Sequence, residues 1–144
     1  MGVASDRGED MGSEEEKAIA SYIKEKYGHD FVFIYDYPTS VRAFYSMRHE
    51  NDPTLSKSFD LLYRGLEITS GAQREHRFDQ LKSQMLEKGF DEKPFESYLN
   101  FFKYGCPPHG GFAPGPSRLL MKIMGYNNVR DVTYLYRGVN RLTP

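Results

Sequence analysis

Two strand-like segments joined by a two-residue turn constrain this chain more than any other feature. Residues 58–63 (SFDLLY) and 66–70 (LEITS) are rich in apolar, β-branched and aromatic residues, and Arg64-Gly65 lies between them. This spacing predicts a β-hairpin with a tight turn. The hairpin in turn predicts that part of the chain folds as an antiparallel sheet.

The predicted hairpin brings acidic residues together. With the turn at Arg64-Gly65, Leu62 faces Glu67, so Asp60 and Glu67 fall on one sheet face as diagonal neighbours. Two such carboxylates repel each other unless a divalent cation, a shared proton or a cationic side chain lies nearby. Mg²⁺ takes one or two carboxylates together with phosphate oxygens, which fits this pair. The alternative is a solvated sheet face with ordinary salt bridges.

Two arginines and a glycine-rich loop extend the candidate site. Ser70 and Arg74 follow the hairpin, and an arginine there can grip a carboxylate with two parallel hydrogen bonds. Residues 105–116 hold four glycines and four prolines, which predicts a segment without regular structure. Glycines before a helix favour phosphate binding, but the Lys-Ser/Thr of a P-loop is missing, and a simple connection is the alternative. Arg118 can reach a phosphate or stack on a base, or it is an ordinary surface arginine.

The remaining pattern predicts helices and strands on both sides of the hairpin. Ser13 and Glu16 form a capping box that opens a helix, and Gly28 ends that helix. The other expected elements are strands at 31–37 (buried), 41–47 and 129–136, and helices at about 78–85, 94–102 and 116–124. Their order predicts an α+β domain, in which helices flank an antiparallel β-sheet.

Length and charge limit the class of protein. With 144 residues the chain is one domain at most, and we expect residues 1–12 to be a flexible lead to a domain at 13–144. A net charge of -1 gives no bulk positive field for nucleic acid, so any such contact must be local. No apolar segment approaches the roughly 18 residues of a membrane span, and no secretory signal is visible. We therefore expect a cytoplasmic protein without a membrane partner.

Histidine and cysteine give no independent candidate site. No metal-ligand spacing or catalytic triad links the four histidines, which are His29, His49, His76 and His109. Cys106 precedes two prolines, and a small packing residue is favoured over a nucleophile. A single cysteine excludes an internal disulfide and favours a reducing compartment.

Four segments of the sequence resemble one known family. Residues 63–76 (YRGLEITSGAQREH) resemble the amino-acid pocket of archaeal and eukaryotic aspartyl-tRNA synthetases. DYPTSVRAFYSM, KYGCPPHGGF and GYNNVRDVTYLYRGVNRLTP resemble its neighbouring segments in the same order. The asparaginyl relatives carry a different sequence in place of TSGAQR, which favours the aspartyl branch. The resemblance implies part of a class II aminoacyl-tRNA synthetase catalytic fold over roughly residues 13–144.

The resemblance implies metal-binding and substrate-binding residues. Asp60, Glu67 and Ser70 would hold Mg²⁺ on the phosphates of ATP. Ser70 and Arg74 would bind aspartate, with Arg74 on the side-chain carboxylate. Mg²⁺ is thus the implied cofactor, and ATP and aspartate are the implied substrates.

The resemblance also implies nucleotide-binding residues. Glu67, Gly115 and Arg118 would bind ATP, and Glu67 and Arg118 are the implied catalytic residues. Arg118 resembles the arginine of the third class II motif, which packs on adenine and reaches the terminal phosphates. Residues 113–118 read APGPSR where the family usually reads GLGLER. Pro114 fixes φ and removes an N–H, and a serine replaces the carboxylate before Arg118, so nucleotide binding should differ from that of the family.

The implied reaction is activation of aspartate by ATP to aspartyl adenylate, followed by transfer to tRNA. The family's first and second motifs and its anticodon domain are not recognised in this sequence, so we expect little or no activity from the chain alone. We expect self-association or a partner that supplies the missing half. The alternatives are a non-catalytic nucleotide-binding, aspartate-binding or assembly module, and an asparagine-synthetase-like paralogue. The net charge does not support tRNA as a partner.

Overall fold

The computed structural model describes residues 10–143, so most of the predicted lead at 1–12 lies outside the described residues. The α-helices are α1 (Ser13–Tyr27), α2 (Phe78–Glu87), α3 (Glu92–Lys103) and α4 (Pro116–Met124), and the 3₁₀ helix η1 spans Val129–Val132. The strands are β1 (Phe31–Tyr35), β2 (Ser58–Tyr63), β3 (Glu67–Gln73) and β4 (Gly110–Pro114). Within the described residues, no helix is long and apolar enough to cross a membrane.

The strands form one sheet in the order β1-β2-β3-β4, and every neighbouring pair is antiparallel. The predicted α+β architecture is therefore confirmed. The turn of the β2–β3 hairpin is at Arg64-Gly65 as predicted, with φ values of 48° and 71°. These are the left-handed backbone angles that place two strands in register across a two-residue turn. Leu62 pairs with Glu67, which confirms the predicted register at that end.

The helices lie where apolar spacing predicts them, with one error at the first cap. α1 ends at Gly28, whose φ of 73° confirms the predicted left-handed cap. The predicted Ser13–Glu16 capping box is wrong, because Ser13 already lies in the first helical turn. Gly12 is the N-cap, and the Glu15 carboxylate accepts a hydrogen bond from its N–H. Glu16 is thereby left to make other contacts.

Two of the predicted strands are absent from the described structure. Residues 41–47 form turns with isolated bridges, because the Gln84 amide of α2 donates hydrogen bonds to the carbonyl groups of Phe44 and Ser46. Residues 129–136 begin as η1, and the Asn128 side chain accepts a hydrogen bond from the backbone of this helix at its start. In both segments a side chain binds backbone groups that a strand would offer to its neighbours: Asn128 from the adjoining residue, and Gln84 from the distant helix α2.

The prediction of no regular structure at residues 105–116 is also wrong. Residues 110–114 form β4, which pairs with β3 along its whole length. Pro114 is tolerated because β4 is an edge strand, where a missing N–H can face away from the sheet. Pro116 is the first residue of α4, as predicted, because its fixed φ suits the first helical turn.

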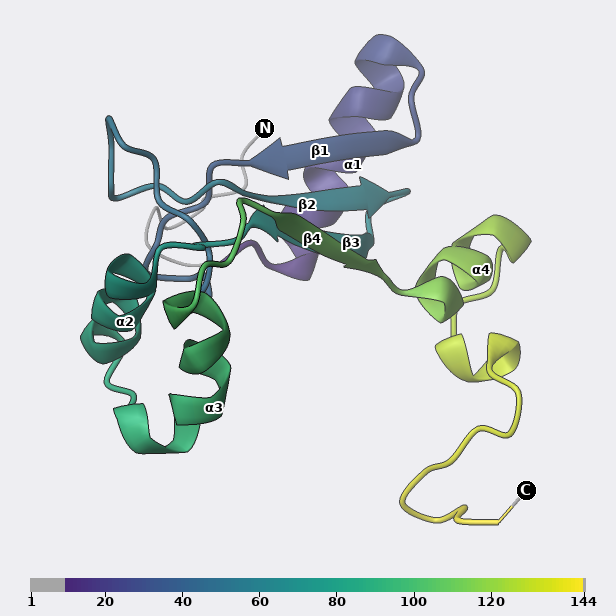
Figure 1. Cartoon of the computed structure of the whole chain (residues 1–144). Coiled ribbons are helices and arrows are strands. Elements are labelled where there is room, and N and C mark those ends of the chain that lie inside the picture. The colour runs from purple at the N-terminus through teal and green to yellow at the C-terminus, as the bar shows by residue number, and fades with distance from the viewer. Residues whose placement is uncertain (1–9, 144) are drawn as a thin grey trace.

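The largest apolar core lies where α2 and α3 pack together. Its buried residues are Phe44, Leu81, Met85, Leu99 and Phe102. In Figure 1, α2 and α3 lie side by side at one end of the sheet, α1 lies behind it, and α4 lies at the opposite end. In this arrangement α4 contacts β3, and α1 contacts β1 and β2.

One face of the sheet is an exposed surface of aromatic rings. The prediction of a buried β1 is wrong, since Phe31, Phe33 and Tyr35 are 50%, 59% and 69% exposed. Phe59 of β2 packs edge-to-face on Phe33 with ring centroids 5.6 Å apart, and Phe112 of β4 is 66% exposed. We call these five residues the aromatic face. Exposed apolar surface of this extent is typical of an interaction site.

Close packing beneath the aromatic face requires glycine at position 71. A Cβ at Gly71 would lie 2.5 Å from the Phe59 ring and 2.8 Å from Cβ of Phe112. Because Phe112 Cβ is fixed to the β4 backbone, we expect Gly71→Ala to cost about 1–3 kcal/mol of the free energy of unfolding, measured in urea. Gly110→Ala is the matched control, since its Cβ would meet nothing closer than 3.4 Å. Equal stability of the two variants would contradict this account.

Candidate functional site

An irregularity in the hairpin sets the positions of three predicted site residues. The register shifts next to Leu62, which leaves Ile68 as an extra residue on β3. Asp60 is therefore directly opposite Ser70, while Leu62 is opposite Glu67. Opposite residues share a sheet face, and so do alternate residues of one strand, so Asp60, Glu67 and Ser70 lie on one face. The sequence pattern contains no signal for this bulge.

Asp60 is buried and pairs with an arginine that sequence reasoning missed. Its side chain is 7% exposed, and its Oδ2 accepts a hydrogen bond from NH2 of Arg42. NH1 of Arg42 lies 3.5 Å from Ser70 Oγ, and the guanidinium stacks on Tyr37 with Cζ 3.7 Å from the ring centroid. Burial alone would lower the pKa of Arg42, but Asp60 raises it above its ordinary value. Arg42 therefore stays charged beside Asp60.

Glu67 is held through both its backbone and its side chain. Its N–H donates to the Glu16 carboxylate at 3.3 Å, and its carbonyl accepts from NH1 of Arg118 at 2.9 Å. Its own carboxylate lies 3.7 Å from the same guanidinium. The two residues predicted to be catalytic, Glu67 and Arg118, are thus in contact across β3 and α4.

Glu16 also belongs to this site, although the sequence predicts for it only a capping role in α1. It is half-buried in the first turn of α1, and its carboxylate contacts the hairpin. Burial raises the pKa of Glu16, the negative charges of Glu67 and Asp60 raise it further, and the Glu67 N–H and Arg118 oppose them. Three carboxylates and two arginines therefore form one cluster on this side of the sheet.

Arg74 lies at the other end of β3, beside an aromatic cavity. The cavity has a volume of about 400 Å³ and is lined by Phe44, Tyr45, Arg74, Phe95, Tyr98, Phe102 and His109. The guanidinium stacks on Tyr45, with Cζ 4.8 Å from the ring centroid, and NH2 donates to the Gly111 carbonyl at 3.4 Å. The Arg74 N–H donates to the His109 carbonyl at 2.9 Å. Both the side chain and the backbone of Arg74 are therefore held in position.

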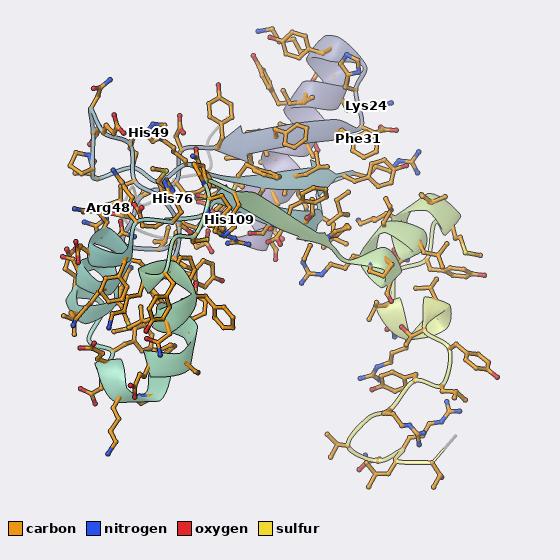
Figure 2. All side chains as sticks on the ribbon, viewed as in Figure 1. Lys24, Phe31, Arg48, His49, His76 and His109 are labelled. Atoms are coloured by element: carbon orange, nitrogen blue, oxygen red, sulfur yellow. The ribbon has the colours of Figure 1, made fainter. Side chains whose placement is uncertain are left out.

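The remaining histidines and the cysteine lie apart from the acidic cluster. Cys106 packs against the apolar core with its Sγ 3.6 Å from His109 Nδ1, and His49 contacts Asp36 at 2.6 Å. Figure 2 shows His109 between α3 and the start of β4, His76 above α2, and His49 in the loop above it. His49, His76 and His109 therefore have separate local environments.

Gly115 is the N-cap of α4, and its amide is already engaged. Its N–H donates to the Ile68 carbonyl at 2.7 Å, so it extends the β3–β4 pairing. A Cβ at position 115 would meet other atoms at 3.6 Å or more, so packing does not require glycine there. The Gly115 N–H is therefore not free to donate to a phosphate, which is the role that a phosphate-binding loop would give it.

The oxygen atoms of the acidic cluster can supply some of the ligands of Mg²⁺, and phosphate oxygens would complete its coordination. No group of three or more His, Cys, Asp or Glu side chains is arranged to hold a metal within residues 10–143. Asp60 Oδ1, however, is buried without a hydrogen-bond partner, and Ser70 is opposite it. Such oxygens fit a hard cation that also takes phosphate ligands.

Comparison with known proteins shows the family of the chain. A family model described as tRNA synthetases class II (D, K and N) matches residues 2–137. The chain belongs to this family. The predicted resemblance to aspartyl-tRNA synthetases is confirmed by curated relatives of that name. The chain is 47% identical over 137 residues to the aspartate–tRNA(Asp/Asn) ligase of Aeropyrum pernix, and 49% identical to that of Thermus thermophilus.

The similarity extends over nearly the whole chain but over a minor part of each relative. The two curated matches cover 95% of this chain and 31% and 32% of the relatives, so the chain spans about a third of their length. The aspartyl tRNA synthetase of Entamoeba histolytica has a TM-score of 0.95 at 37% identity, covering 99% of this chain and 30% of that one. The asparaginyl-tRNA synthetase of Pyrococcus horikoshii has a TM-score of 0.88 at 34% identity, covering 99% and 33%. The predicted partial class II catalytic fold is therefore confirmed.

The raised pKa of Glu16 has a measurable consequence for stability. The folded chain disfavours ionisation of the Glu16 carboxyl. The stabilisation that the protonated carboxyl gives to the folded state is therefore lost as pH rises from about 4.5 through the folded-state pKa. We expect Glu16→Gln to stabilise the chain at pH 7.5 by less than about 1 kcal/mol, because solvent partly screens the half-buried group. The difference should vanish near pH 4. Thermal melts from pH 4 to 8 measure this difference in stability, and Glu25→Gln, at an exposed position of α1, is the control. A Glu16→Gln variant that is less stable than wild type at pH 7.5 would contradict the prediction.

Proposed function

We propose that this chain supplies the part of an aspartyl-adenylate-forming site that recognises aspartate and holds the phosphates of MgATP. The observation that carries the proposal is the state of Arg74. It is positioned by Tyr45 and Gly111 beside a cavity, yet it forms no ion pair with an acidic side chain in the described part of the chain. A positioned arginine without a protein carboxylate is suited to a carboxylate ligand.

Aspartate is favoured over asparagine by the chemistry of the guanidinium. Arg74 offers N–H donors only, and the aspartate carboxylate accepts two of them in parallel. The asparagine amide has only one acceptor oxygen, so its NH₂ group would face the second N–H donor of Arg74. Neither of those two donors would then have an acceptor. Sites that leave a buried polar group unpaired discriminate strongly against the wrong ligand.

The acidic cluster supports the nucleotide part of the proposal. Asp60, Glu67 and Ser70 would hold Mg²⁺, which neutralises charge on the phosphates when it is bound. Glu67 orients Arg118 through its carbonyl and its carboxylate, so the arginine stays near the same phosphates. Gly115 would contribute through its place at the start of α4 rather than through its engaged amide.

We extend the proposal to the family's second step, which is transfer of aspartate from the adenylate to tRNA in the cytoplasm. Since the chain spans about a third of its curated relatives, the whole reaction depends on groups beyond the described residues. The names of the relatives give no support to an asparagine-synthetase-like reaction or to a non-catalytic nucleotide-binding, aspartate-binding or assembly module. Those two functions are therefore not favoured.

Aspartate binding tests the proposal directly. By isothermal titration calorimetry we expect the folded chain to bind aspartate more tightly than asparagine, and Arg74→Ala to lose at least about tenfold, because charge-assisted hydrogen bonds contribute roughly 1.5–3 kcal/mol. Arg74→Lys should also lose affinity, since a lysine cannot bind in the bidentate mode. Arg48→Ala is the control, because Arg48 pairs with the exposed Glu87 of α2. Equal binding of the two amino acids, or no effect of Arg74→Ala, would refute the proposal.

We further propose that the aromatic face is covered by the rest of a class II synthetase domain. Its exposed rings include Phe33 and Phe112, and the relatives are about three times longer than this chain. We expect aspartate-dependent exchange of pyrophosphate into ATP to be negligible for the chain alone. Exchange should appear when the remaining part of a relative is added as a second polypeptide.

Two substitutions separate this docking from aspartate binding. Phe33→Glu places a charge on the aromatic face and should abolish the restored exchange while aspartate affinity is retained. Phe101→Glu on α3 changes a ring that is 77% exposed outside this face, and should have no effect. Exchange by the chain alone would show that no second part is needed. Self-association that light scattering detects and Phe33→Glu abolishes would show that a second copy of the chain covers the aromatic face.

A further inference from the structure

A protein cation already occupies the position next to the proposed Mg²⁺ ligands. The Arg42 side chain is 13% exposed, and its NH2 donates to Asp60 Oδ2. Its NH1 lies 3.5 Å from Ser70 Oγ. Two of the three proposed metal ligands are thus in contact with one guanidinium. The turn segment that carries Arg42 is bridged at Ser46 to Arg74, the residue that follows β3.

The hydrogen bonding around this arginine is incomplete. Asp60 Oδ1, Arg42 Nε and the Tyr37 hydroxyl are all buried without a hydrogen bond of normal geometry, although burial and the neighbouring Asp60 carboxylate raise the pKa of Tyr37. Buried polar atoms are normally paired, and three unpaired atoms in one cluster indicate that a ligand or a rearrangement completes it. The Asp60 side chain is more than nine-tenths buried, so its free oxygen is the natural ligand for a cation there.

We propose that Arg42 is the resident counter-ion of Asp60, and that a divalent cation binds here by displacing the Arg42 guanidinium. The inference rests on the proposed function, because that function makes Asp60 and Ser70 metal ligands. A guanidinium and a divalent cation on the same carboxylate would be like charges a few ångströms apart in a buried site, where repulsion is strong. Even with the cation on Oδ1 and Arg42 on Oδ2, this repulsion disfavours joint occupancy, so we expect the guanidinium to move away.

The surroundings of Arg42 allow it to leave Asp60 without losing all its partners. The Asp10 carboxylate lies 3.8 Å from the same NH2 and is 61% exposed, so it can take over the ion pair nearer to solvent. Stacking on Tyr37 does not depend on Asp60 and can guide the side chain during the exchange. The phosphates of a bound nucleotide would be a second anionic partner for the released guanidinium.

Metal affinity of the full chain tests this exchange without any enzymatic assay. Mn²⁺ is the probe, and electron paramagnetic resonance measures its free concentration in titrations of wild type, Arg42→Gln, Arg42→Lys and Asp60→Asn. We expect Arg42→Gln to bind Mn²⁺ at least about fivefold more tightly than wild type, the lower end of typical coupling between two sites. Arg42→Lys keeps the competing charge and should stay close to wild type. Asp60→Asn should lose binding.

The outcomes separate this inference from the proposed function. Weaker binding by a folded Arg42→Gln would show that Arg42 orients Asp60 for the metal, and would overturn the displacement. Absence of Mn²⁺ binding in wild type and in Arg42→Gln would overturn both the metal site and the displacement. Aspartate binding through Arg74 would still be tested separately.

A measurement on wild type covers the case in which Arg42→Gln fails to fold. In a ¹⁵N spectrum of the arginine side chains, saturating Mg²⁺ should shift the Arg42 Nε signal, assigned with Arg42→Lys. The Arg48 signal, from an exposed ion pair with Glu87, should not shift. An unchanged Arg42 signal at saturating Mg²⁺ would overturn the displacement.

Discussion

The two-residue turn at Arg64-Gly65 fixes the positions of the other parts of the site. Both residues have left-handed backbone angles, so β2 and β3 leave the turn in one register. A slip of one residue would move Asp60 and Ser70 to the aromatic side of the sheet. α1 also depends on this turn, since a Cβ at Gly65 would lie 3.2 Å from Cα of Lys17. The acidic cluster therefore takes its geometry from the turn and the bulge next to it.

Charge in the site is balanced by pairs that a ligand can exchange. Asp60 is paired with Arg42 and Glu67 with Arg118, while Glu16 adds a carboxylate whose ionisation burial opposes. The Asp60–Arg42 pair is buried, and such a pair adds little net stability, because desolvation of both ions offsets their attraction. Its presence in this cluster is more readily explained by ligand binding than by stability.

The local elements could be predicted from the sequence, but the contacts between distant segments could not. The hairpin and the Gly28 cap follow from backbone preferences of single residues, and both are confirmed. The segment at 41–47 alternates like a strand, but Gln84, about 40 residues later, captures its carbonyl groups. Arg42 lies in that segment, so its role could not be foreseen. The bulge at Ile68 likewise has no signature that separates it from a regular strand.

The unusual APGPSR sequence before and within α4 changes how this chain can bind a nucleotide. β4 extends to Pro114, and the Gly115 amide pairs with Ile68, so this loop offers the phosphates little free backbone. Nucleotide binding at the proposed site must then depend mainly on side-chain charge: Mg²⁺ on Asp60 and Glu67, and Arg118 held by Glu67. Interactions between charges weaken as salt rises, whereas hydrogen bonds from a rigid loop weaken much less. ATP affinity in this chain should therefore depend more strongly on Mg²⁺ and ionic strength than it would with a backbone cradle.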